Sequence, residues 1–250
     1  MALAQALVGS YPNAASGSAD PHFNDVVLLM DIASNGTVSD IKNNTMTKTL
    51  GGSVVTGPFS GTNAINVTSS GYISSSTLSF STSGAYTVEA WIRFNSLKTI
   101  RACGASNNFR NHNQFTADEW QSSTFQAGGT WYLPWFWSNG STNYSIFPKV
   151  VSAGDWYHWF MSFDGSSKVV FGVGELGDST GNMGRRTHAT RFDNLTDNLR
   201  LHASRRSDVG DGFRTYGWRI TEGVARYGDP GSDGHSTGTY TMPNAAWPTS

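Results

Sequence analysis

The sequence predicts an all-β fold, and three observations support this prediction. Gly, Ser, Thr and Asn are abundant and Lys is scarce, which favours strands and turns over helices. Residues 86–94 largely alternate between apolar and polar side chains, as a strand with one buried face does. An Asp-Gly pair at Asp164 and Gly165 separates two apolar runs, which is typical of a β-hairpin. The length of 250 residues suits one sandwich or barrel.

The first expected element is an extended N-terminal arm or linker, residues 1–20, followed by one domain over residues 21–250. The arm begins with a short apolar run that has no basic residues, so it does not resemble a signal peptide. A polar excursion is expected at residues 31–48. Short strands are expected around it: residues 26–30, 63–67 and 71–73.

Residues 86–94 form the clearest expected strand. One face is apolar and is assigned to the core: Tyr86, Val88, Ala90, Ile92 and Phe94. The other face is polar and carries one aromatic side chain of the exposed type, Trp91: Thr87, Glu89, Trp91 and Arg93.

Two aromatic strands are expected farther along the chain. Residues 131–137 carry rings on both faces and form a hairpin with residues 144–147, and Pro134 indicates an edge strand or a bulge. Residues 156–163 are also apolar on both faces and pair with residues 168–174. A two-sheet sandwich needs apolar groups on only one face of each sheet. Two interpretations follow: loops or the arm cover the outer face, or part of that face binds a partner.

The remaining segments are more polar. We expect residues 99–130 to be irregular and residues 175–195 to form a polar insertion. Strands at residues 199–202 and 213–220 are expected to close the sandwich.

Several stretches resemble landmarks of one known family: Asp20-Pro21-His22-Phe23, residues 86–94, the hairpin that contains Trp156 and His158, and residues 216–227 with the Pro-containing tail at 242–249. They are similar to laminin-G-like (concanavalin A-like) jelly-roll domains of tailed-phage (cyanophage-type) virion proteins. The resemblance implies a two-sheet antiparallel jelly-roll sandwich with a short extended N-terminal arm.

The same resemblance implies a non-enzymatic virion structural protein, in capsid decoration or associated with the tail or a fibre. Such a protein would dock on other virion proteins through protein-protein contacts, in many copies or as an oligomer, and would assemble in the host cytoplasm. One alternative is a carbohydrate-binding module that attaches the virion to host surface polysaccharide. A third hypothesis is a glycan hydrolase.

Composition and motifs exclude other classes of function. The net charge of −1 argues against a nucleic-acid partner, and no apolar run approaches the ~20 residues of a membrane span. Cys103 is the single cysteine, so it forms no intrachain disulfide, which fits a reducing cytoplasm.

Catalytic and metal sites are also not indicated. Glycoside hydrolysis needs two carboxylates ~5–10 Å apart, yet no second acid follows Glu89 on its strand. The six histidines are dispersed, so zinc is not expected, and His158 is interpreted as a packed core histidine. We expect no enzyme and no cofactor. Calcium is the one alternative, with oxygen ligands from Asp31, Asn35 and Asp40.

Aromatic side chains and arginines are the candidate binding residues. For a glycan or a protein partner the candidates are Trp91, Arg93, Trp131, Trp135, Trp137 and Tyr144. For docking on acidic neighbours the candidates lie in the Arg-rich C-terminal third: Arg185, Arg186, Arg205 and Arg206. The alternative for these arginines is a solvated surface whose charges are paired internally.

Overall fold

The computed structural model describes the following residues: 20–49, 52–67, 72–75, 78, 84–97, 101–105, 119–123, 125–138, 143–187, 199–203 and 213–248. Apart from Asp20, the N-terminal arm predicted for residues 1–20 lies outside this part of the chain. The described residues hold one short 3-10 turn, η1 (Phe23–Asp25), and are otherwise strands and loops.

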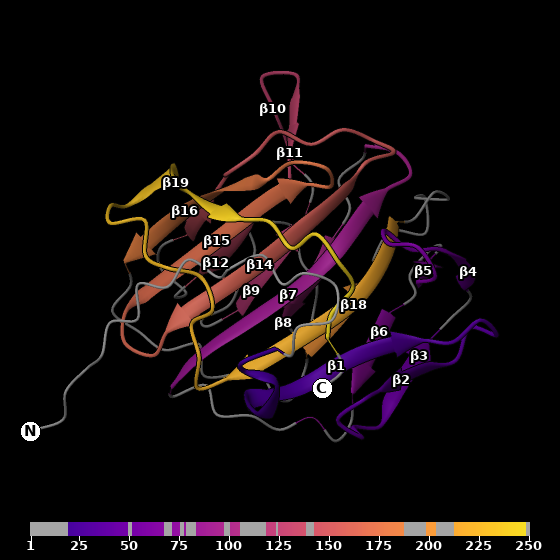
Figure 1. Ribbon diagram of the computed structural model, residues 1–250. Helices are drawn as coiled ribbons and strands as arrows, with labels where there is room; N and C mark the ends of the chain where they lie inside the picture. Colours follow the sequence, from indigo (N-terminus) through magenta and orange to yellow (C-terminus); the bar gives the residue numbers. More distant parts are fainter. Residues whose placement is uncertain are drawn as a thin grey trace, which may run out of the picture.

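Two antiparallel sheets stack as a sandwich (Figure 1), which confirms the predicted fold class. The larger sheet has ten strands, whose main path runs β19-β16-β15-β14-β7-β18-β1-β2, with β5 and β4 added beside β18. Its strands are β1 (Val26–Ile32), β2 (Val38–Asp40), β4 (Gly52–Thr56), β5 (Asn63–Val67), β7 (Ala85–Phe94), β14 (Trp156–Asp164), β15 (Lys168–Glu175), β16 (Thr180–Thr187), β18 (Phe213–Glu222) and β19 (Gly234–Thr241).

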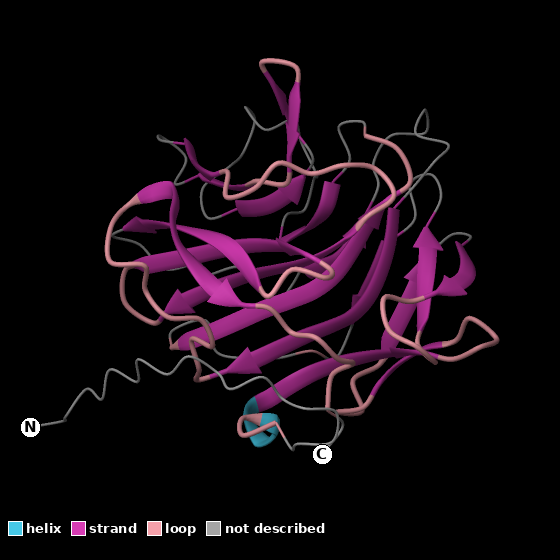
Figure 2. Cartoon of the chain, turned by 45° about the horizontal axis from the view of Figure 1, so that its top comes forward, coloured by secondary structure: helices cyan, strands magenta, loops and turns pink. Residues whose placement is uncertain are grey.

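The smaller sheet has seven strands in the order β13-β12-β9-β8-β17-β6-β3. These strands are β3 (Met46–Thr49), β6 (Tyr72–Ser75), β8 (Arg101–Ala105), β9 (Glu119–Ser123), β12 (Trp135–Ser138), β13 (Asn143–Ile146) and β17 (Leu199–Ala203). A separate hairpin of β10 (Phe125–Ala127) and β11 (Thr130–Tyr132) projects from the sandwich, as both ribbon views show (Figures 1 and 2).

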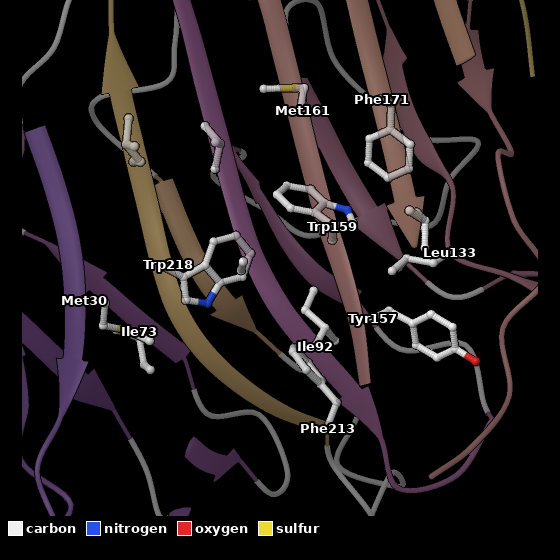
Figure 3. Packing of buried hydrophobic residues seen from close by; sticks show 14 of the residues in the cluster. Met30, Ile73, Ile92, Leu133, Tyr157, Trp159, Met161, Phe171, Phe213 and Trp218 are labelled. Atoms are coloured by element: carbon white, nitrogen blue, oxygen red, sulfur yellow. The ribbon is translucent and has the colours of Figure 1, made fainter. Parts of the chain in front are cut away.

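The core between the sheets is aromatic. The face of β7 predicted to be apolar is buried there, and Trp159 and Trp218 meet edge to face with their ring centroids 5.4 Å apart (Figure 3). Phe171 lies against the other side of Trp159, at 5.6 Å. Burial of such side chains stabilises the fold by about 1.5–3 kcal/mol each.

Much of the outer face of the larger sheet is buried as well. After β18 the chain crosses this face, forms β19 at the sheet edge and returns across it (Figure 1). We call residues 223–248 the C-terminal cover. Its Tyr227 stacks on Phe160 of β14 at 3.6 Å, and Trp247 is only 8% exposed. The interpretation that loops cover the two-faced strand at 156–163 is therefore confirmed.

Some predicted boundaries are wrong. Residues 99–130 and 175–195 were expected to lack strands, yet they contain β8, β9, β10 and β16. Pro134 lies between β11 and β12 and not inside a strand. These strands are held by backbone hydrogen bonds to neighbouring strands. Gly, Ser, Gln and Arg can therefore occupy them, and the alternation of apolar and polar residues that marks a strand in a sequence is absent.

Gly172 tests how tightly the outer face is packed. A Cβ at this position would collide with the ring of Phe160, whereas a Cβ at Gly228 would meet nothing within 4 Å. We expect Gly172→Ala to lower the free energy of unfolding by about 1–3 kcal/mol, the usual cost of overpacking. Gly228→Ala is the matched control and should change it by less than ~0.5 kcal/mol in urea denaturation. Equal values for the two variants would contradict the packing described.

Candidate functional site

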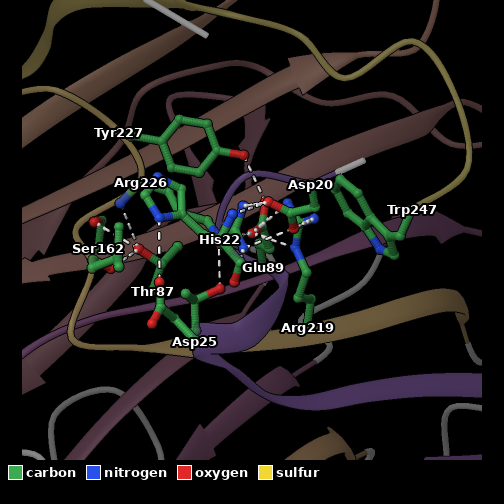
Figure 4. A network of polar contacts seen from close by, with 12 residues as sticks. Asp20, His22, Asp25, Thr87, Glu89, Ser162, Arg219, Arg226, Tyr227 and Trp247 are labelled. Carbon is green, nitrogen blue, oxygen red and sulfur yellow. Dashed lines mark hydrogen bonds and ion pairs between the residues drawn. The ribbon is translucent and has the colours of Figure 1, made fainter. Parts of the chain in front are cut away.

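The family landmarks converge on one cluster in the outer layer of the larger sheet. We call this cluster the buried polar network: Asp20, Glu89, His158, Arg219, Arg226 and Tyr227. Its members come from segments as much as 206 residues apart, yet the side chains of Asp20, Glu89, Arg219, Arg226 and Tyr227 point toward one another (Figure 4). The segments that looked diagnostic in the sequence are thus the ones that build this cluster.

Two carboxylates and two guanidinium groups pair within the network. Arg219 donates from Nε to Glu89 Oε1 at 2.8 Å and from Nη1 to Asp20 Oδ2 at 2.9 Å. Arg226 donates from Nη2 to the same Asp20 oxygen at 2.8 Å. The four formal charges cancel, which is the condition under which charges are tolerated away from water.

A bulge in β18 brings Arg219 to the outer face. The register between β18 and β7 shifts between Tyr216 and Arg219, and Gly217 there has a φ of +62°. The extra residue lets Trp218 enter the core while Arg219 faces outward opposite Glu89. Glycine is favoured at such a position because side chains are strained at positive φ.

Neutral partners complete the network. Glu89 Oε2 accepts a hydrogen bond from the Tyr227 hydroxyl at 2.6 Å and lies 3.3 Å from His158 Nε2. His158 Nδ1 lies 3.0 Å from the Tyr240 hydroxyl. The prediction of a packed, hydrogen-bonded core histidine is confirmed.

The network is closed to chemistry with a substrate. Burial alone would raise the pKa of Glu89, but the Arg219 guanidinium and the His158 hydrogen bond outweigh it and hold the pKa well below its usual range. Burial lowers the pKa of His158 despite the nearby carboxylate. The side chains of Glu89 and His158 are 0% exposed. A carboxylate that stays ionised and out of reach of water does not serve as a general acid, so Glu89 is structural.

Acid is expected to lower the stability of the protein over two successive pH ranges. The pKa of His158 is lowered by burial, so below pH ~6.5 the unfolded chain takes up a proton that the folded chain does not, and stability falls. The pKa values of Asp20 and Glu89 are also lowered, since both arginines outweigh burial, so below pH ~4 the unfolded carboxylates bind protons first and stability falls further. Urea midpoints at pH 7.5, 5.5 and 3.5 should decrease in that order, and His158→Asn should flatten the upper step. A midpoint that rises on acidification would contradict this assignment.

The placement of Trp91 as an exposed aromatic was wrong. Its side chain is 0% exposed, and its ring centroid lies 5.2 Å from that of Phe59 and 5.4 Å from that of His158. The C-terminal cover and the Phe59 loop bury the face that alternation had assigned to solvent. Arg93, on the same face, is only partly buried.

The other predicted aromatic residues lie at one edge of the sandwich. Trp131 of β11 is partly buried against the core. The backbones of β12 and β13 place Trp137 opposite Tyr144 and Trp135 opposite Ile146, and β13 contacts β16 and β19 of the other sheet. The side chains of Trp135, Trp137 and Tyr144 are outside the described structure, so their role as binding residues stays a prediction.

Sequence reasoning missed an aromatic cluster beside this edge. We call it the aromatic ledge: Tyr132, Phe147 and His235. The ring centroids of Tyr132 and Phe147 are 5.8 Å apart and those of Phe147 and His235 are 5.0 Å apart. Tyr132 and Phe147 are partly buried and His235 is exposed. No local pattern links these residues, because three separate segments supply them.

The predicted docking arginines are not equivalent. Arg185 is paired internally, through Asp229 at 2.7 Å and Asp233 at 2.8 Å, both in the C-terminal cover. Arg185 therefore has the internal pairing that the alternative expects, and a docking role for it stays a prediction. Arg186 is partly buried beside His235, whose pKa is lowered by burial and by this arginine. Arg205 and Arg206 lie outside the described residues.

Of the candidate calcium ligands, Asp40 has other partners. The two carboxylate oxygens of Asp40 accept backbone hydrogen bonds from Leu29, Lys42 and Asn44. Within the described ranges no group of three His, Cys, Asp or Glu side chains is arranged to hold a metal ion. The described residues form no helix that is long and apolar enough to cross a membrane.

Comparisons with known proteins agree with the fold. The family model described as the concanavalin A-like lectin/glucanases superfamily matches residues 67–207, more than half of the chain. No curated protein matches this chain.

Solved structures are similar at low sequence identity. Domain 4 of AbnA, an extracellular GH43 arabinanase from Geobacillus stearothermophilus solved with arabinotriose, has a TM-score of 0.55 and 16% identity, covering 80% of this chain and 93% of that chain. A mutant of HCR/D has a TM-score of 0.53 and 11% identity, covering 81% of this chain and 48% of that one. Tailspike protein 2 of bacteriophage CBA120 has a TM-score of 0.47 and 12% identity, covering 71% and 28%. At these identities the likeness concerns the fold alone.

Proposed function

Because this chain belongs to the concanavalin A-like lectin/glucanases superfamily, we propose that it is a non-catalytic binding module. That superfamily includes both binding and hydrolytic proteins, so the fold does not decide between them. The observation that favours binding is the buried polar network. It unites Asp20, Glu89 and His158, side chains of the types that hydrolases use, yet the two carboxylates are internally neutralised and their side chains are at most 3% exposed.

We further propose that the ligand is a glycan and that it binds at the aromatic ledge. Tyr132 and Phe147 present partly exposed rings, and His235 and Arg186 add polar groups beside them. Apolar rings with a few polar groups are the usual composition of a site for a small ligand. The strands that carry Trp135, Trp137 and Tyr144 end at the same edge. The arabinotriose-bound arabinanase domain gives this proposal a fold-level analogy.

A glycan array followed by calorimetry tests this proposal. We expect binding of at least one oligosaccharide, weakened tenfold or more by Tyr132→Ala or Phe147→Ala. Ile41→Ala, at a residue that is 37% exposed next to β2, at the opposite end of the larger sheet from β19, is the control and should bind normally. Glycan binding that is unaffected by Tyr132→Ala and by Phe147→Ala would show that the binding site is not at the aromatic ledge. Release of reducing sugar from the bound glycan would contradict a non-catalytic role.

We propose a tailed-phage particle as the place where this module acts. The support is the similarity of Asp20-Pro21-His22-Phe23 and residues 216–227 to virion jelly-roll proteins. On a virion assembled in the host cytoplasm, many copies would give weak single contacts a large avidity. Docking on other virion proteins is then how the module is held. Purified protein should bind capsids or tails of its phage, and density for the chain in an intact particle would decide between capsid and tail. Absence of the chain from purified particles would contradict this placement.

A further inference from the structure

Two arginines lie side by side on the outer face of the larger sheet. Arg93 of β7 is directly opposite Arg214 of β18 in the antiparallel register. Their neighbours two positions along, Trp91 and Tyr216, pack into the outer apolar cluster, so both arginines point to the same outer face. Like charges directly opposite on adjacent strands destabilise a sheet.

No group in the described structure neutralises this pair. The Nε atoms of Arg93 and Arg214 are buried, and neither has a hydrogen-bond partner among the described residues. Burial lowers the pKa of Arg214, and the positive charge of Arg93 lowers it further. Arg219, on the same face, contrasts with them because it meets both Glu89 and Asp20.

The flanking residues in this row are neutral. Trp156 lies opposite Arg93 on one side, and Asn66 lies opposite Arg214 on the other. Asn66 Oδ1 accepts a hydrogen bond from Asn95 Nδ2 at 2.7 Å, and Ser53 of β4 follows in the row. The row therefore combines two uncompensated guanidinium groups with an aromatic ring, two amides and a hydroxyl.

We infer that Arg93 and Arg214 bind the carboxylate of an acidic sugar, a uronate residue of a glycan. This inference rests on the proposed glycan-binding function and names the class of sugar, at a contact on β7 and β18 that is separate from the aromatic ledge. Guanidinium groups match carboxylate geometry with paired N–H donors, so a bound uronate would offset the positive charge of the pair. The amides of Asn66 and Asn95 and the hydroxyl of Ser53 suit sugar hydroxyls better than they suit a second acidic side chain.

Calorimetric titration with a galacturonate trimer and with a galactose trimer tests the inference. We expect the acidic trimer to bind at least tenfold more tightly, and Arg93→Gln or Arg214→Gln to remove that preference. Arg93→Lys keeps the charge but loses the planar donor pair, so this variant should retain only part of the preference for the acidic trimer. Lys48→Gln, which removes an exposed charge on β3, is the control and should leave the preference intact.

Thermal unfolding separates a binding role from a structural one. Without ligand, Arg214→Gln should leave Tm unchanged or raise it, because it removes a repulsion and an unsatisfied cation. A fall in Tm of several degrees would instead assign the pair a structural role and overturn the inference.

The remaining outcomes are also decisive. Equal binding of both trimers, unaffected by the arginine variants, would overturn the uronate site and leave the proposed glycan function standing. Arginine-dependent binding of a poly-glutamate peptide with no binding of either trimer would overturn the uronate assignment in favour of an acidic protein segment. If neither trimer binds and the glycan array is also negative, the proposed glycan-binding function itself would be contradicted.

Discussion

Glu89→Gln is expected to lower the free energy of unfolding by about 3–5 kcal/mol, the cost of breaking a buried ion pair by removing one partner. The substitution keeps the size of the side chain and one carbonyl acceptor but removes its negative charge. Arg219 and Arg226 would then share Asp20 as their remaining counter-ion within the buried polar network. An uncompensated positive charge would be left where water does not reach it.

Chemical denaturation of the two proteins at pH 7.5 measures this effect. Asp229→Asn is the matched control, because it also converts an acid to its amide within an ion-pair cluster but at a side chain that is 35% exposed. Surface pairs of this kind contribute about 0–1 kcal/mol. If Glu89→Gln costs no more than Asp229→Asn, the network is not the charge-balanced centre described above.

Phe160→Ala is expected to cost about 3–5 kcal/mol, as much as a large residue between the two sheets. Phe160 is on the outer face of β14, is 0% exposed, and stacks on Tyr227 while its edge meets Tyr240 at 4.8 Å. In a plain two-layer sandwich this position would be solvated and the change would be nearly neutral.

Trp159→Ala on the inner face of the same strand provides the comparison. We expect the two variants to lose similar amounts of stability in urea denaturation, since the cover buries the outer face as the second sheet buries the inner one. Val150→Ala should be almost neutral, because that side chain is half exposed. A loss below ~1 kcal/mol for Phe160→Ala would show that the cover detaches readily.

Most of the long apolar strands were predictable from the sequence. The strand at 86–94, the hairpin around Asp164 and Gly165 and the strands at 26–30 and 213–220 all appear where periodicity and turn chemistry placed them, whereas β19 was not predicted. Asp164 Oδ1 accepts backbone hydrogen bonds from Ser166, Ser167 and Lys168, as an Asp-Gly turn favours. The strands that were missed, such as β9 and β16, are polar. Their pairing is fixed by neighbouring backbones, and it leaves little trace in the local sequence.

The candidate site was less predictable, and Trp91 illustrates why. Alternation correctly assigned Trp91, Glu89 and Arg93 to one face. That face was interpreted as solvated because its residues are polar, but a covering segment supplies Arg226, Tyr227 and Trp247 to it. Residues such as Tyr132, Phe147 and His235 carry no shared local signal, and only the packing of three segments brings their rings together.

By itself, the sequence determined the fold class and the two faces of the regularly alternating strands such as residues 86–94, because a strand's period of two is a local property. Only the tertiary structure decided which polar faces are buried, since Glu89 meets its counter-ion 130 residues away and through a bulge at Gly217. It also decided which arginines are neutralised: Arg185, Arg219 and Arg226 find carboxylates, whereas Arg93 and Arg214 face each other. Charge pairing is a long-range contact that composition and periodicity do not encode.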